Sequence, residues 1–226
     1  MPIFEAPAVY TQEVFLTIIS YFFEHLGLKP YIDHHSTDAN IIPLTQTPKG
    51  YFVRRDRKNR HRVVNVFTRE GKKVYSIERA SPLNPVWCLR EFPSRTEVAT
   101  IRCGFFSTSV DWHNKQGVQH REVRAESSVG GNFRSFYLND GSKYQWTKGS
   151  KFLEKVSNPG GGDEELRERI AKVRLMRQFK FDFELLVDED AVDLEYALAT
   201  AFISMMVQWG YGDITETRGP SFIGET

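Results

Sequence analysis

The densest group of side chains able to do chemistry is a run of basic residues between positions 54 and 62. Its members are Arg54, Arg55, Arg57, Lys58, Arg60, His61 and Arg62. Arginine offers planar donors that match the oxygens of a phosphate or carboxylate, and lysine adds a point charge. In a strand–turn–strand arrangement, these side chains would crowd the tip and both flanks of one hairpin. The cluster is therefore a candidate anion-binding site. The alternative is a solvated hairpin whose charges prevent edge-to-edge strand pairing.

The charge of the chain changes sign along its length, although the formal net charge is only +1. Residues 51–102 carry thirteen basic and five acidic residues, a net of +8, whereas residues 181–226 carry one and ten, a net of −9. A basic middle fits an anionic partner. Two solvated faces that partly neutralise each other in the fold would give the same pattern.

Nothing in the sequence indicates catalysis or a metal centre. No GxSxG, P-loop or GxGxxG motif occurs, and Gly160 to Gly162 lack the Lys-Ser/Thr pair of a phosphate loop. The scattered histidines match no zinc spacing; they are His34, His35, His113 and His120. We therefore expect a protein that is not an enzyme and that has no cofactor and no metal.

Two further features bear on the compartment and on partners. Cys88 and Cys103 form no CxxC pair, so reduced, buried thiols are expected. The N-terminus lacks the positive region of a secretory signal, which favours a cytoplasmic protein. Basic and aromatic residues alternate between Trp112 and Arg134, but alternation in half-buried strands gives the same pattern, and we expect no nucleic-acid partner.

Most of the chain from Tyr51 onward reads as short strands separated by turns, the spacing typical of a sandwich or barrel. Gly71, Gly117 and Gly141 stand where turns require a positive φ. The stretch EELRERIAKVRLM, residues 164–176, is predicted to begin as a short charged helix before it returns to strand.

Two helices are predicted. The first, about 11–25, has an apolar stripe and is too short to cross a bilayer. A polar linker follows it and ends in an edge strand at the IIPL segment. The second, about 190–209, follows Asp188, Glu189 and Asp190, which complement a helix dipole. Every residue from Tyr196 to Val207 is apolar, Thr or Ser, so this helix must be buried within the protein. Neither segment predicts a transmembrane span.

The order of these pieces resembles the tubby C-terminal-like superfamily, which includes tubby, the plant LURP-one-related proteins and the phospholipid scramblases. The segments that carry the resemblance are VNVFTREGKKVYSIER (64–79), PVWCL (85–89), FYLNDGSKYQW (136–146) and KFDFELLVDEDAVDLEYALATAFISMM (180–206). The resemblance implies a closed antiparallel β-barrel of about twelve strands around a central, hydrophobic C-terminal helix. The predicted N-terminal helix would be an addition to that pattern. The scramblase branch is disfavoured, because Asp188, Asp190 and Asp193 do not form an EF-hand loop and no cysteine cluster exists.

The expected organisation is an N-terminal helix and linker over 1–49, a barrel domain over 50–212, and a tail over 213–226. The resemblance implies recognition of phosphoinositide or other anionic headgroups by basic residues on the barrel surface, so we expect a peripheral, non-catalytic lipid-binding module. Two alternatives stay open. One is a protein-interaction scaffold that uses the N-terminal helix or the acidic C-terminal region. The other is a carrier of a small apolar ligand beside the helix.

Overall fold

The structure is a computed structural model, and it describes residues 41–59, 62–81, 85–104, 107–117, 119–128, 131–159, 165–175 and 183–209. Within these residues, fourteen strands form one sheet. The strands are β1 (Ile41–Ile42), β2 (Lys49–Arg55), β3 (Val63–Thr68), β4 (Lys73–Arg79), β5 (Val86–Glu91), β6 (Glu97–Cys103), β7 (Thr108–Trp112), β8 (His120–Glu122), β9 (Arg124–Ser128), β10 (Gly131–Tyr137), β11 (Lys143–Thr147), β12 (Phe152–Ser157), β13 (Leu166–Leu175) and β14 (Phe183–Val187). Helix α2 (Leu194–Val207) follows the last strand.

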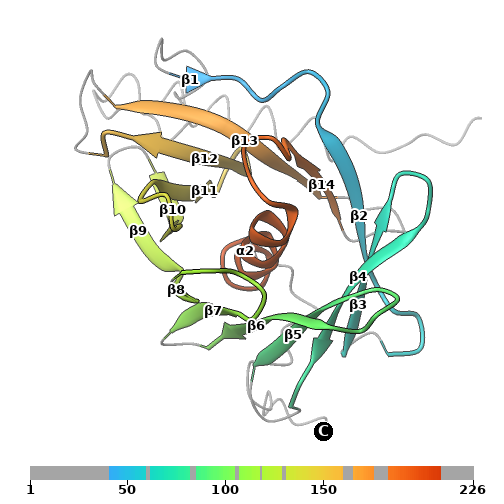
Figure 1. Cartoon of the computed structure of the whole chain (residues 1–226). Helices are drawn as coiled ribbons and strands as arrows, with labels where there is room; N and C mark the ends of the chain where they lie inside the picture. Colours follow the sequence, from blue (N-terminus) through green and yellow to red (C-terminus); the bar gives the residue numbers. More distant parts are fainter. Residues whose placement is uncertain are drawn as a thin grey trace, which may run out of the picture.

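The sheet is a nearly closed antiparallel barrel, as Figure 1 shows. Thirteen strands, β2 to β14, pair in chain order except at one place, and the last of them, β14, pairs with the first, β2. The exception lies between β8 and β9, which Val123 alone separates in the chain. The extended stretch 120–128 pairs with β7 through its first part and with β10 through its second part. We expected a closed barrel of about twelve strands. The observed barrel has thirteen strands, β2 to β14, and its hydrogen bonding is interrupted within the stretch 120–128.

Strand β13 corrects the expectation of a short helix in the 164–176 stretch. Residues 166–175 form an extended strand that pairs with β12 on one side and with β14 on the other. The two residues of β1 pair in parallel with β13 at Arg167 and Glu168, ahead of the part that β14 covers. The pattern misled because β13 contains one extra residue, Ile170, where Leu153 and Glu154 pair with Ala171 and Arg169. This bulge interrupts the alternation that a strand normally shows. The predicted N-terminal helix lies outside the described residues.

Helix α2 runs through the middle of the barrel, with strands on all sides of it (Figure 1). Eleven of its fourteen residues are buried, including the whole run from Ala197 to Met206. Asp193 is the N-cap, and its carboxylate accepts a hydrogen bond from the backbone N–H of Glu195 at 3.0 Å. The burial predicted from the apolar sequence is therefore confirmed, and the helix is part of the core.

Large aromatic side chains of the barrel wall pack against α2 from several strands. Trp87 of β5 meets Phe202 edge-on with 5.1 Å between ring centroids, and Trp112 of β7 meets the Tyr196 ring at 4.6 Å. Trp146 of β11 donates its indole N–H to the Thr200 hydroxyl at 3.0 Å. Edge-on aromatic pairs contribute beyond their buried area, and the hydrogen bond satisfies a donor that has no access to water.

The first turn of α2 is tied to the strands by a buried carboxylate. Glu195 is 6% exposed and accepts hydrogen bonds from the Tyr75 hydroxyl at 3.1 Å and from the Asn114 side-chain amide at 3.0 Å. The Lys115 ammonium lies 2.7 Å from Oε2 of Glu195, the oxygen that also accepts from Asn114, and it donates to the carboxylate of the N-cap residue Asp193 at 2.5 Å. The helix is therefore fixed in position along the barrel axis as well as packed against the wall.

The turns agree with the chemistry read from the sequence. Gly71, Gly117 and Gly141 have φ values of 81°, 87° and 74°. At Gly117 a side chain is excluded for a second reason, since an added Cβ would lie 2.8 Å from the Asn139 amide nitrogen. Three hairpin turns thus depend on residues that tolerate the left-handed region.

The β10–β11 turn is held by the carboxylate of Asp140. It accepts hydrogen bonds from the Ser142 backbone N–H at 3.0 Å and from the Tyr144 hydroxyl at 2.8 Å, and the Lys155 ammonium lies 3.1 Å away. Burial alone would raise the pKa of Asp140, but these three donors outweigh it and hold the pKa at about 2.

We expect Thr200→Val to lower the free energy of unfolding by about 1–3 kcal/mol, because it leaves the buried Trp146 N–H without an acceptor. In a Trp146→Phe background the same change should cost clearly less. Denaturant unfolding followed by circular dichroism gives the four values of this double-mutant cycle. Equal costs in the two backgrounds would mean that the hydrogen bond has no role in stability.

The native protein should lose stability as pH falls from about 4 to about 2, because Asp140 has a lower pKa when folded than its ordinary value of 3.8. Asp140→Asn should remove about 1 kcal/mol of that loss, a figure reduced for the solvent exposure of the site. Thermal unfolding of both proteins across this range is the measurement. Parallel pH profiles would contradict the assignment.

Candidate anionic-ligand site

The basic cluster of the sequence lies on the β2–β3 hairpin, as predicted. Arg54 pairs with Asn65 and Arg55 with Val64 across the two strands. Asp56 starts the loop: its backbone N–H bonds the Val63 carbonyl at 2.8 Å. Its carboxylate accepts from the backbone N–H groups of Asn59 at 3.0 Å and Lys58 at 2.9 Å, which lower the pKa of Asp56. The loop is therefore a defined turn that carries its own internal anion.

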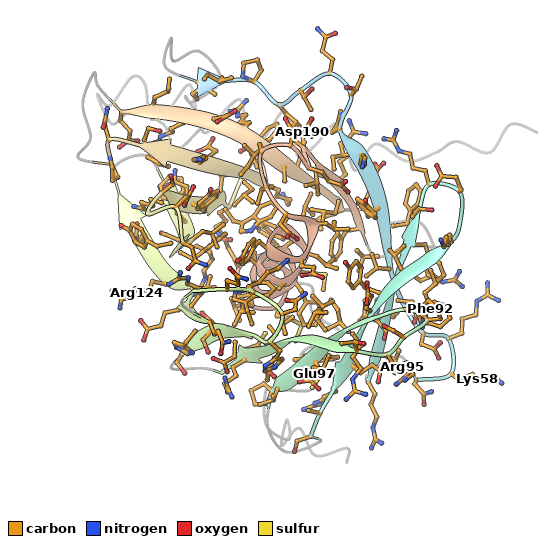
Figure 2. All side chains as sticks on the ribbon, viewed as in Figure 1. Lys58, Phe92, Arg95, Glu97, Arg124 and Asp190 are labelled. Atoms are coloured by element: carbon orange, nitrogen blue, oxygen red, sulfur yellow. The ribbon has the colours of Figure 1, made fainter. Side chains whose placement is uncertain are left out.

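The structure brings only some of the candidate residues together. Arg57, Lys58 and Arg62 are exposed in the loop, and Figure 2 shows Lys58 pointing away from the barrel. Arg54 and Arg55 are neighbours in a strand and so point to opposite faces of the sheet. Arg60 and His61 lie outside the described residues. The candidate residues that the structure describes thus do not all lie on one surface. The loop cations and Arg54 make up the part open to a ligand, here called the hairpin site.

The cations of the hairpin site have no carboxylate partner among the described residues. Arg54, Arg57, Lys58 and Arg62 form no ion pair with any acidic side chain in that part of the chain. Asp56, the acidic residue of the loop, is occupied by backbone N–H groups and by the Asn65 amide at 3.3 Å. Four positive charges therefore remain available to an external anion.

The hairpin site stands at one end of the barrel, here called the basic end, where β2 finishes and α2 also finishes. The β11–β12 turn, with Lys148 and Lys151, and the end of β13, with Arg174, face the same end, because neighbouring strands are antiparallel. Helix α2 has no basic residue in its own last turn.

The opposite end of the barrel, here called the acidic end, holds the segment between β14 and α2 with its aspartates and glutamate. Two cations at this end are paired: Lys49 lies 2.5 Å from Glu189, and Lys155 lies 3.1 Å from Asp140. The sign change along the sequence thus becomes, in large part, a separation of charge between the two ends.

The other residues considered for chemistry are in structural contacts. Asp111 bonds the His120 ring nitrogen Nδ1 at 2.5 Å and also pairs with Arg102. His113 lies 3.4 Å from Glu97. The described residues contain no group of three or more His, Cys, Asp and Glu side chains that could hold a metal ion.

Both cysteines are free and buried, in agreement with the sequence. Burial raises the pKa of Cys103 to about 12, and burial together with the charge of Glu97 raises the pKa of Cys88. Both thiols are therefore protonated at neutral pH and unsuited to nucleophilic chemistry.

Sequence reasoning missed the cations on β12 and β13. Lys151, Arg169, Lys172 and Arg174 come from two segments whose relation depends on the register between these strands. The spacing of residues within each segment does not predict the register between β12 and β13. A cation next to an aromatic residue in a turn, as in the Lys151–Phe152 pair, was the only available signal.

No protein-family model matches the chain, and no curated protein matches it either. The chain is similar to the X-ray structure of a protein from Arabidopsis thaliana, AT5G01750, with 14% sequence identity and a TM-score of 0.40. That alignment covers 74% of this chain and 92% of the other. A likeness at this level says nothing about what the chain binds. Among the described residues, no helix has both the length and the apolar character needed to span a membrane.

Proposed function

We propose that this protein is a non-catalytic binding module that recognises anionic phospholipid headgroups at a membrane surface, peripherally and reversibly. The observation that supports it best is the hairpin site, where Arg54, Arg57, Lys58 and Arg62 have no ion pair among the described residues. Guanidinium groups are suited to phosphate oxygens, which they bind through two donors at once.

The separation of charge between the two ends favours a membrane surface over a small acidic ligand. A planar anionic surface would attract the basic end and repel the acidic end, so that the barrel meets it in one orientation. Each Lys or Arg near an anionic bilayer contributes about 1 kcal/mol. The three loop cations, Arg57, Lys58 and Arg62, would therefore give a salt-sensitive attraction and no permanent anchoring.

We further propose kinship with the tubby C-terminal-like superfamily. The support is the combination of a nearly closed antiparallel barrel with a final strand, β14, followed directly by a buried helix, α2. Fold kinship alone does not assign a ligand, so the lipid proposal rests on the hairpin site.

The interior of the barrel favours a surface function over a carrier function. The core around α2 is occupied by fully buried large side chains; they include Trp87, Trp112, Trp146, Phe136, Phe183 and Phe202. Since these residues come from several strands and from the helix itself, the space beside α2 is filled by the protein's own side chains.

The proposal predicts that Arg57→Glu/Lys58→Glu weakens binding to vesicles of phosphatidylcholine with phosphatidylserine and a phosphatidylinositol phosphate. Loss of two cations should lower the partition coefficient by about 30-fold or more at low salt. Co-sedimentation at two salt concentrations measures it, and native binding should itself decline as salt rises.

The matched control is Lys72→Glu/Arg124→Glu, which makes the same change in net charge at exposed positions away from the basic end. This variant should bind as the native protein does. Equal loss in both variants would leave net charge as the cause and refute the hairpin site. Native binding that is absent, or that ignores salt, would favour the scaffold alternative.

A further inference from the structure

A second group of cations lies on the outer wall of the barrel, where β12 begins and β13 approaches its end. Phe152 and Lys172 are direct partners across the two strands. The Lys172 ammonium lies 4.3 Å from the centroid of the Phe152 ring, and the Arg169 guanidinium carbon lies 4.2 Å from the same centroid. One aromatic ring therefore holds two positive groups close together, in positions fixed by strand register.

Lys151 brings a third cation to this place. It precedes Phe152 and has a φ of 58°, a conformation that only a well-determined backbone keeps at a residue other than glycine. Its backbone carbonyl accepts a hydrogen bond from Val173 at 2.9 Å, which joins it to β13 beside Lys172. The Lys151 ammonium donates to the Gly149 carbonyl at 3.0 Å, and this is its one polar contact within the described part of the chain.

The nearby carboxylates are already used by other cations. Arg169 lies 3.6 Å from Glu154, and Arg174 lies 3.5 Å from Glu184. Neither Lys151 nor Lys172 forms an ion pair with a carboxylate of the described residues. Two positive charges thus lack a carboxylate partner at a half-buried place on the barrel wall.

The surplus of positive charge and the partial burial lower the pKa values of these lysines. Burial lowers the pKa of Lys172, and the positive charges of Arg174, Arg169 and Lys151 lower it further. Burial also lowers the pKa of Lys151. Repulsion of this kind persists in the free protein only at a cost in stability, which a bound anion would remove.

We propose that Lys151 and Lys172, with Arg174 beside them, form a second site that binds a phosphate monoester, here called the wall site. A phosphate monoester carries between one and two negative charges at neutral pH, which matches the two unpaired lysines. Strand β14 lies between β13 of the wall site and β2 of the hairpin, and the register places Lys172 level with Gly50 at the start of β2, away from the tip of the hairpin. The monoester could belong to a lipid headgroup or to a soluble phosphate, and the site does not depend on the hairpin.

The first test is thermal unfolding of the full chain in inorganic phosphate and in chloride at equal ionic strength. At phosphate concentrations about ten times the dissociation constant, the unfolding midpoint of the native protein should rise by about 3–6 °C. Lys172→Met should unfold at a higher midpoint than the native protein in chloride, because repulsion is relieved, and should show no rise in phosphate. Lys151→Met should behave in the same way.

The control is Lys72→Met, which removes an exposed cation of the β3–β4 turn, outside both proposed sites, and should keep the full response to phosphate. A rise that survives in both Lys172→Met and Lys151→Met would overturn the wall site, and so would a native protein that does not respond to phosphate. Because no vesicles are used, this result stands whether or not the hairpin binds membranes.

A second arm identifies the source of the phosphate group. Vesicles containing a phosphatidylinositol phosphate are compared with phosphatidylserine vesicles of equal total charge. If Lys172→Met weakens binding to the first kind alone, the wall site takes a lipid headgroup. If it weakens binding to neither while the phosphate-dependent rise is lost, the wall site takes a soluble phosphate.

Discussion

A helix that is apolar on every side can be kept from water only by surrounding it, and this requirement shapes the rest of the molecule. The residues Ala197 to Met206 are buried on all faces of α2, so a single sheet packed on one side would leave half of the helix exposed. A sheet that curves until its first and last strands pair removes that exposure. The aromatic contacts of Trp87, Trp112 and Trp146 then fill the space between wall and helix.

The chain-order arrangement of the strands also determines where charge can gather. In an up-and-down barrel, alternate connections come to the same end, so residues far apart in the sequence become neighbours in a ring of turns. The connections at the basic end carry lysines and arginines, whereas the segment that leads from β14 into α2 carries acids. The difference in charge between the two ends of the barrel therefore depends on which connections carry the charged residues.

The sequence was sufficient to predict elements that depend on the types of neighbouring residues alone. The apolar run from Tyr196 to Val207 predicts α2, and the glycines at 71, 117 and 141 predict turns because other residues avoid a positive φ. It was insufficient where the outcome depends on partners. The charges of 164–176 suit a helix, but β12 and β14 on either side make residues 166–175 a strand. The basic hairpin was predictable from adjacency, yet the opposite directions of Arg54 and Arg55, and the meeting of Lys151 with Lys172, follow from pleat and register.

The pairing of β2 with β14 has a consequence for synthesis of the protein. Lys49 and Glu189, which join at this junction, are 140 residues apart in the chain. During translation, most of the wall emerges before either the strand that completes it or the helix that occupies its centre. Contacts of such long sequence separation form slowly, since a large loss of chain entropy precedes them. The growing polypeptide must therefore carry an unfinished, apolar inner surface until β14 and α2 leave the ribosome, a period in which chaperone protection would matter most.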